Sequence, residues 1–244
     1  MKSKSIFFAA MRHSYLGIFI PLLILFSFVC YFSQIQLSSY MELNYLLTAN
    51  SNMQVFLFYI PMLLILLLPI NTILENELLY VRCKSCLHAY LLKVKNAFLL
   101  ASFIIVIKLM IEIIFAFITN SQWAIFASPY YFLIYIIQLG TVFFTFTVYF
   151  LFREITKNSA LSVLMYLFLF GLDFLLSMQP INGIFFELNL FCSPMCLTFG
   201  YIESLFSGNP PNYLFHLFYM VSKIMAVLIF TCILMNQKRR RKLA

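Results

Sequence analysis

Residues 97–118 read AFLLASFIIVIKLMIEIIFAFI, an apolar run that only two charged residues interrupt, Lys108 and Glu112. The hydrocarbon core of a bilayer is about 30 Å thick, so a helix that crosses it needs about 20 consecutive apolar residues. Every backbone N–H and C=O group in lipid must be bonded within the segment, which favours a helix over irregular chain. The run therefore predicts a membrane-spanning helix.

Five further runs have a similar length and composition, at about 15–33, 53–74, 130–151, 159–178 and 213–235. The whole chain of 244 residues is 64% hydrophobic and only 10% charged. A soluble domain of this size could not cover so much apolar surface with so little polar material. The sequence predicts an all-α integral membrane protein, one domain over residues 1–244 with six transmembrane helices.

Lysine and arginine are unevenly distributed between the connecting segments. At least two lie in each of the segments 75–96 and 151–158 and in the C-terminal tail, whereas the segments 34–52, 119–129 and 179–212 have none. The positive-inside rule therefore predicts that both termini of this multi-pass protein are cytoplasmic. The net charge of +8 is explained by this distribution, which is not that of a nucleic-acid groove. The tail KRRRK is expected to contact anionic lipid.

Charge is concentrated at residues 74–86, which read LENELLYVRCKSC. Apolar residues recur at helical spacing from about 78 to 92, which predicts a short helix lying at the cytoplasmic interface. The polar side of this helix would be formed by Arg82, Lys84, Ser85 and His88. The alternative is an interfacial loop that only fixes the topology.

This arrangement resembles the membrane subunit of an ABC-2 type transporter, with its type V exporter-like transmembrane domain. Six spans, cytoplasmic ends, and an acidic start before a basic helix between spans two and three carry the resemblance. Glu75 and Glu77 match the acids of the family's E-x-E-x-G-T consensus, whereas Leu79 and Tyr80 lie near the place of the Gly-Thr and no proline precedes Ser85. The match is one of architecture and charge pattern.

The resemblance implies that the 78–92 helix is a coupling helix that contacts a cytoplasmic ATPase subunit. The residues expected at this contact are Glu75, Glu77, Arg82, Lys84 and His88. It also implies that the outer segment at about 179–212 holds short re-entrant helices. The alternative for that segment is a loop packed on the outer face.

The function implied by the resemblance is that of a permease subunit in an ATP-driven exporter of the bacterial cytoplasmic membrane. Its substrate would be hydrophobic or amphipathic, for example an antimicrobial peptide in bacteriocin immunity. The sequence lacks the G-x-x-x-x-G-K-[ST] motif, so ATP and Mg would bind to a partner chain and no cofactor to this one. The expected partners are the ATPase subunits, a second permease chain (identical or homologous) and membrane lipid, without nucleic acid.

Four charged residues fall inside the predicted spans: Lys108, Glu112, Asp173 and Lys223. A charge at the bilayer centre costs at least about 2.5–3.5 kcal/mol, so these side chains should face protein or water and form pairs. The spacing predicts a pair of Lys108 with Glu112, and a cross-helix pair of Asp173 with Lys223. They either line a substrate path or fix helix packing. An ion-coupled secondary transporter, the main alternative function, would depend on the same residues.

Other patterns are weaker. The Cys83-x-x-Cys86-x-His88 motif lacks a second ligand pair on its side of the membrane, so no metal site is expected. Cys192 and Cys196 are four residues apart, and the sequence does not decide whether they form a disulfide. Glu75, Glu77 and Arg82 faintly resemble the motif of CAAX-type membrane proteases, but the histidines on later spans are missing, and no catalytic residue is expected. A further alternative function is that of a membrane immunity or scaffold protein that transports nothing.

Aromatic residues are dense at the ends of the spans: Tyr130, Tyr131, Tyr149, Tyr166, Tyr213 and Tyr219. Aromatic belts at the membrane interface account for this distribution. A cavity lined with aromatic side chains for an apolar ligand is the alternative.

Overall fold

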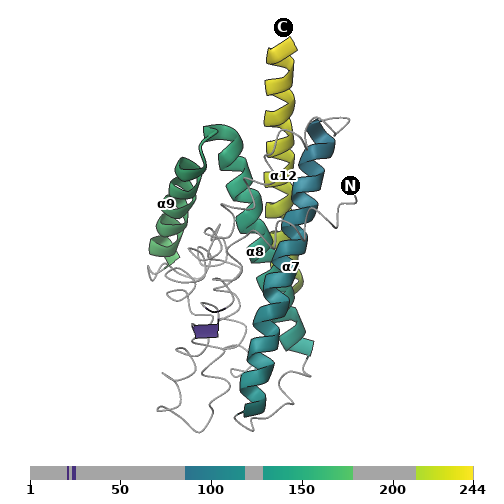
Figure 1. Cartoon of the computed structure of the whole chain (residues 1–244), viewed down its shortest axis with the longest axis vertical. Coiled ribbons are helices and arrows are strands. Elements are labelled where there is room, and N and C mark those ends of the chain that lie inside the picture. Colours follow the sequence, from purple (N-terminus) through teal and green to yellow (C-terminus); the bar gives the residue numbers. More distant parts are fainter. Residues whose placement is uncertain (1–20, 22–23, 26–85, 119–128, 178–212, 244) are drawn as a thin grey trace.

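The computed structural model describes residues 21, 24–25, 86–118, 129–177 and 213–243 (Figure 1). Within these residues the chain forms four helices, which are α7 (Cys86–Ile118), α8 (Pro129–Thr156), α9 (Ser159–Ser177) and α12 (Tyr213–Leu243). The predicted spans at 53–74 and, apart from three residues, at 15–33 lie outside this part of the chain, as does the outer segment 179–212.

Three of the helices are long and apolar enough to cross a membrane. The qualifying stretches are Leu87–Ile111, Gln138–Thr156 and Leu217–Gln237, and α9 adds a shorter apolar stretch, Ser159–Leu172. The described part of the chain is therefore that of an all-helical membrane protein, as the sequence predicts. The count of six spans stays a prediction.

The start of α7 differs from the predicted boundary between a coupling helix at 78–92 and a span at 97–118. The helix begins at Cys86 and continues without a break to Ile118. The connecting residues 93–96 read KVKN and contain neither glycine nor proline, so nothing in them ends a helix. The described end of the predicted coupling helix, residues 86–92, is therefore the first part of the same helix that enters the membrane.

The connection between α8 and α9 is a tight turn, shorter than the predicted segment 151–158, because α8 continues to Thr156. Lys157 has a left-handed backbone with φ of 57°, and its N–H donates to the Arg153 carbonyl at 2.9 Å, which closes α8. The Asn158 side-chain oxygen accepts the Ala160 N–H at 2.9 Å and so caps α9. The two helices form an antiparallel hairpin.

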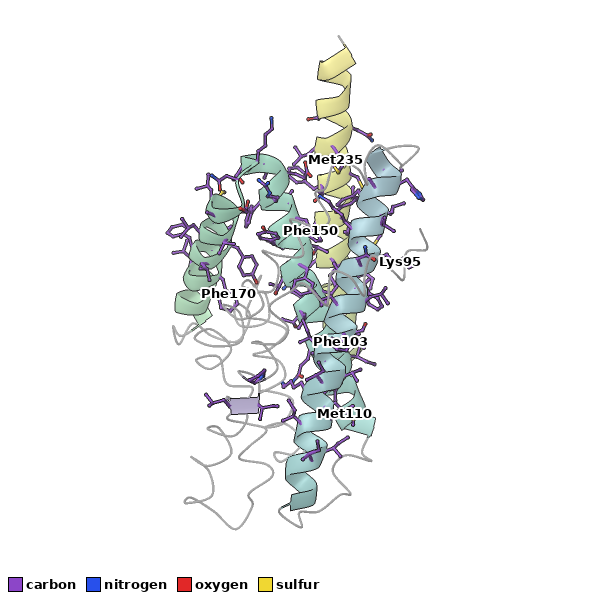
Figure 2. The ribbon with its side chains drawn as sticks, viewed as in Figure 1. Lys95, Phe103, Met110, Phe150, Phe170 and Met235 are labelled. Carbon is purple, nitrogen blue, oxygen red and sulfur yellow. The ribbon has the colours of Figure 1, made fainter. Side chains whose placement is uncertain are left out.

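Helix α8 occupies the centre of the described bundle and contacts α7, α9 and α12 (Figure 1). Its span is 67% buried, whereas that of α12 is only 17% buried. Phe98 of α7 meets Phe143 of α8 edge-on, with ring centroids 5.4 Å apart. The largest fully buried side chains of the described core are Tyr149, Tyr166, Phe146, Phe170 and Leu100. Figure 2 places Phe150 on α8 and Phe170 on α9.

Two tyrosines assigned to the interfacial belt are instead core residues. Tyr149 is 0% exposed and Tyr166 is 1% exposed. Both lie about two turns from the α8–α9 turn, on the faces that these helices turn toward the bundle. For this pair, burial against neighbouring helices has replaced contact with lipid headgroups.

A glycine permits close contact between α8 and α12. The sulfur and terminal methyl of Met220, on α12, fill the space that a Cβ atom at Gly140 would need. A larger residue at this position would require the end of the flexible Met220 side chain to move.

Apart from Lys108 and Lys223, the basic residues of the described helices gather at one end of the bundle. The start of α7, the α8–α9 turn and the end of α12 lie together there, and α12 extends beyond the other helices (Figure 1). We name this the base-rich end, and it carries Lys93, Lys95, Arg153, Lys157 and the KRRRK segment. The directions of the described helices thus bring the base-rich segments to the same end of the bundle, as the alternation along the sequence predicts.

Candidate functional site: a buried polar lane

A lysine lies buried between the two central helices. The Lys108 ammonium, on α7, donates to the side-chain oxygen of Gln138, on α8, at 2.9 Å. Lys108 is 7% exposed and Gln138 is 2% exposed. A buried charge in an apolar bundle is costly unless acceptors surround it, and the amide oxygen of Gln138 supplies one of them.

Gln138 continues into a row of hydroxyl groups along one face of α8. Thr141 and Thr145 follow at helical spacing and are 3% and 1% exposed. The Thr145 hydroxyl donates to the Thr141 carbonyl at 3.0 Å. Tyr166 reaches across from α9, and its hydroxyl donates to the Thr145 oxygen at 3.1 Å. These contacts connect α7, α8 and α9 through polar side chains.

We call this set the polar lane, and it comprises Lys108, Gln138, Thr141, Thr145 and Tyr166. In a medium of low dielectric constant, hydrogen bonds of this kind specify one packing of the helices. The same amide and hydroxyl groups can bind polar parts of a substrate if the helices separate. Among the described residues, no group of three His, Cys, Asp or Glu side chains could hold a metal ion.

The sequence identified Lys108 but missed the partner that the structure gives it. Glu112, the predicted partner, lies one turn further along α7, and its side chain is outside the described set, so the Lys108–Glu112 pair stays a prediction. The signal for Gln138 was available, because it is the sole amide in the apolar stretch 130–151. The threonines gave no such signal, since spans commonly contain this residue type.

Lys223, on α12, packs against an aromatic ring of its own helix. Its ammonium lies 4.1 Å from the ring centroid of Tyr219, one turn earlier. A cation over an aromatic face is attracted by the electron density of the ring. The predicted partner, Asp173, is on α9 with its side chain outside the described set, so that cross-helix pair also stays a prediction.

The predicted ATPase contact is described only at its last residue. His88 is exposed in the first turns of α7 at the base-rich end. The other four residues, Glu75, Glu77, Arg82 and Lys84, lie outside the described part of the chain. Nearby on α7, Lys93 is buried and Lys95 is exposed on the outer side of the helix (Figure 2).

No protein-family model, curated protein or solved structure matches the chain. The chemistry of the described residues and the arrangement of the helices therefore carry the functional argument.

Proposed function

We propose that the chain is the membrane-spanning permease subunit of an ATP-driven exporter of the ABC-2 type. The observation that carries the proposal is the base-rich end. There the start of α7, the α8–α9 turn and the end of α12 lie together, and α12 extends beyond the other helices (Figure 1). Such an end offers a charged surface to a cytoplasmic subunit. Since the sequence has no P-loop motif, that subunit would hold ATP and Mg.

The continuity of α7 supports a mechanical connection between this surface and the polar lane. His88 and Lys108 lie on one unbroken helix, 20 residues apart, which corresponds to about 30 Å at 1.5 Å per residue. A displacement at the base-rich end would therefore be transmitted to the contact between Lys108 and Gln138. ATP binding in the partner would shift α7 against α8 in this way.

The substrate class follows from the composition of the described bundle. Most of its side chains are apolar, and the polar lane adds one ammonium, one amide and three hydroxyl groups inside the bundle. This combination suits a hydrophobic or amphipathic molecule, including an antimicrobial peptide. The substrate would leave between this chain and a second permease chain, in the bacterial cytoplasmic membrane.

The burial of Lys108 favours one further candidate, an ion-coupled secondary transporter. A lysine inside a span can exchange a proton with a path through the protein, and transporters place ionisable side chains at such positions. Such a carrier would need Lys108 but no ATPase subunit. The two candidates differ in what accompanies the chain when it is purified.

The test compares two matched variants of the tagged chain, expressed in its own host and purified in gentle detergent. Glu75→Lys with Glu77→Lys alters the predicted ATPase contact, whereas Glu187→Lys with Glu203→Lys makes the same charge change in the predicted outer segment. We expect a P-loop ATPase to copurify with the unaltered chain and with the outer variant, but not with the first. Equal ATPase in all three preparations would refute the assignment of Glu75 and Glu77.

A further inference from the structure

Polar side chains interrupt all four described helices at a similar distance from the base-rich end. Between them and that end lie stretches free of charged and amide side chains, at 97–107, 139–152, 159–172 and 224–235. Each stretch has 11 to 14 residues, or about 16–21 Å at 1.5 Å per residue. A helix that crosses a hydrocarbon core of about 30 Å needs about 20 apolar residues, so each stretch alone is too short. We name the residues that follow these stretches on the far side the polar level: Lys108, Gln138, Asp173 and Lys223.

The contacts between α7, α8 and α9 place three of these residues at the same depth. Lys108 and Gln138 are bonded to each other, so α7 and α8 share this level. Helices α8 and α9 are antiparallel, and Tyr166 of α9 is bonded to Thr145 of α8. Gln138 and Asp173 each lie seven residues further from the α8–α9 turn than this bonded pair. Their backbones therefore lie at the same distance from the base-rich end.

Lys223 reaches this depth through its side chain. Its helix, α12, runs parallel to α8 and contacts it where Met220 lies against Gly140 (Figure 1). The Lys223 ammonium lies 4.1 Å from the ring centroid of Tyr219, the residue before Met220, so the side chain points away from the base-rich end. Gln138 is two residues from Gly140. The Lys223 ammonium is therefore within about one helical turn of Gln138 in depth.

The polar level lies inside the helices and not at their ends. Helix α7 continues for ten residues past Lys108, α8 begins nine residues before Gln138, and α12 begins ten residues before Lys223. These extensions are about 13–15 Å long. With the base-rich side chains at the membrane interface, about 10 Å of the hydrocarbon core remains beyond the polar level.

The section between the polar level and the base-rich end is closely packed. It contains the five largest fully buried side chains of the described core, Leu100, Phe146, Tyr149, Tyr166 and Phe170. Lys223, in contrast, is partly exposed. A charge in dry hydrocarbon costs at least about 2.5–3.5 kcal/mol, and an aspartate side chain is too short to reach the interface from the depth of Asp173. Water at the polar level would remove much of this cost.

We propose that water reaches the polar level from the membrane face opposite the base-rich end, so that the dry barrier of the bundle is about 20 Å thick instead of about 30 Å. The closely packed section closes the bundle toward the base-rich end. In the proposed exporter, the polar group of an amphipathic substrate would meet water at this level. The inference itself rests on the helix geometry and needs neither an ATPase nor transport.

Cysteine labelling measures where the water ends. All six native cysteines are replaced by serine, and a membrane-impermeant maleimide is added to the face opposite the base-rich end. Thiols react as thiolates, which form in water. Each cysteine at the polar level is paired with one placed a turn nearer to the base-rich end on the same helix face. The pairs are Asp173→Cys with Leu169→Cys, and Lys223→Cys with Val227→Cys.

A third pair keeps every charge of the chain. Ser222→Cys is next to Lys223 and Ala226→Cys lies one turn nearer to the base-rich end, both at exposed positions of α12. This pair decides the outcome if the variants that remove a charge fail to insert. Lys157→Cys, at the base-rich end, identifies the labelled face because it should stay unmodified under the same conditions.

We expect the cysteines at the polar level to react at least about tenfold faster than their partners, because only they are in water. Variants are compared at equal amounts in the membrane. Equal rates within the pairs, or no labelling at the polar level, would overturn the proposal. Neither result bears on the copurification of an ATPase, so the two proposals fail separately.

Discussion

The ammonium of Lys108 and the amide oxygen of Gln138 are joined at 2.9 Å between α7 and α8, with both side chains buried. The sequence placed only the lysine in a candidate site. The contact makes α7 and α8 depend on each other at a depth where water is scarce. It also provides the first test of the polar lane.

Gln138→Leu should destabilise the protein because it removes an acceptor from a buried charge. Hydrogen bonds to charged groups contribute about 1.5–3 kcal/mol, and we expect a loss of that order in the free energy of unfolding, measured by denaturation in detergent. Replacing Lys108 by Met as well should restore most of the loss, since a well-packed apolar pair can take the place of a buried polar one. A double variant that is no more stable than Gln138→Leu would contradict this role of the pair.

Gly140→Ala should force the end of the Met220 side chain to move, because it occupies the space of the new methyl group. Overpacking costs about 1–3 kcal/mol, and the flexibility of methionine should keep the cost here near or below the lower end of that range, as thermal unfolding can measure. In a Met220→Ala background the same substitution should cost much less. Gly171→Ala, at a partly exposed helical position of α9, is the control and should be neutral or stabilising. Equal costs of Gly140→Ala in both backgrounds would show that the contact is not limiting.

Asn158→Ala should weaken the start of α9, because the Asn158 side chain accepts the Ala160 N–H. Loss of such a cap costs about 1 kcal/mol of stability. Lys157→Gly should have the opposite effect, since glycine adopts a φ of 57° without steric cost. The unfolding midpoints of the two variants should therefore lie on opposite sides of that of the parent. If both lie below it, the geometry of this turn is incorrect.

Lys157→Cys tests the orientation in the membrane. In a background without native cysteines, the positive-inside rule predicts that a membrane-impermeant maleimide labels this position only after the cells are opened. Asn209→Cys, in the predicted outer segment 179–212, is the matched control and should be labelled in intact cells. The reverse pattern would invert the topology and place the base-rich end outside.

The sequence predicted some helices closely because apolar length alone determines them. The span predicted at 159–178 appears as α9, Ser159–Ser177. Lys157 and Asn158 form the turn before it. The predicted span began too late for α7 and ended too early for α8, because polar residues were used to mark these boundaries. Charged residues continue a helix readily, and their long stems allow the head groups to reach water or a partner.

The polar lane could be predicted only in part, because it is made by helix packing. A single helix shows that Gln138 is unusual in a span, but the direction in which it points depends on α7. The bond between Tyr166 and Thr145 depends in the same way on the α8–α9 turn. Threonine and tyrosine occur widely in spans, so their residue type alone did not indicate a site.

The most direct test of the central claim is the composition of the complex that the tagged, unaltered chain forms in its own host. We would isolate it in gentle detergent after mild cross-linking and identify its components by mass spectrometry. The proposed function predicts two P-loop ATPase subunits with two permease chains, either two copies of this chain or this chain with a homologue. If the chain is isolated without an ATPase under conditions that preserve other membrane complexes, it is not a permease of this type, and Lys108 becomes the first residue to test for ion coupling.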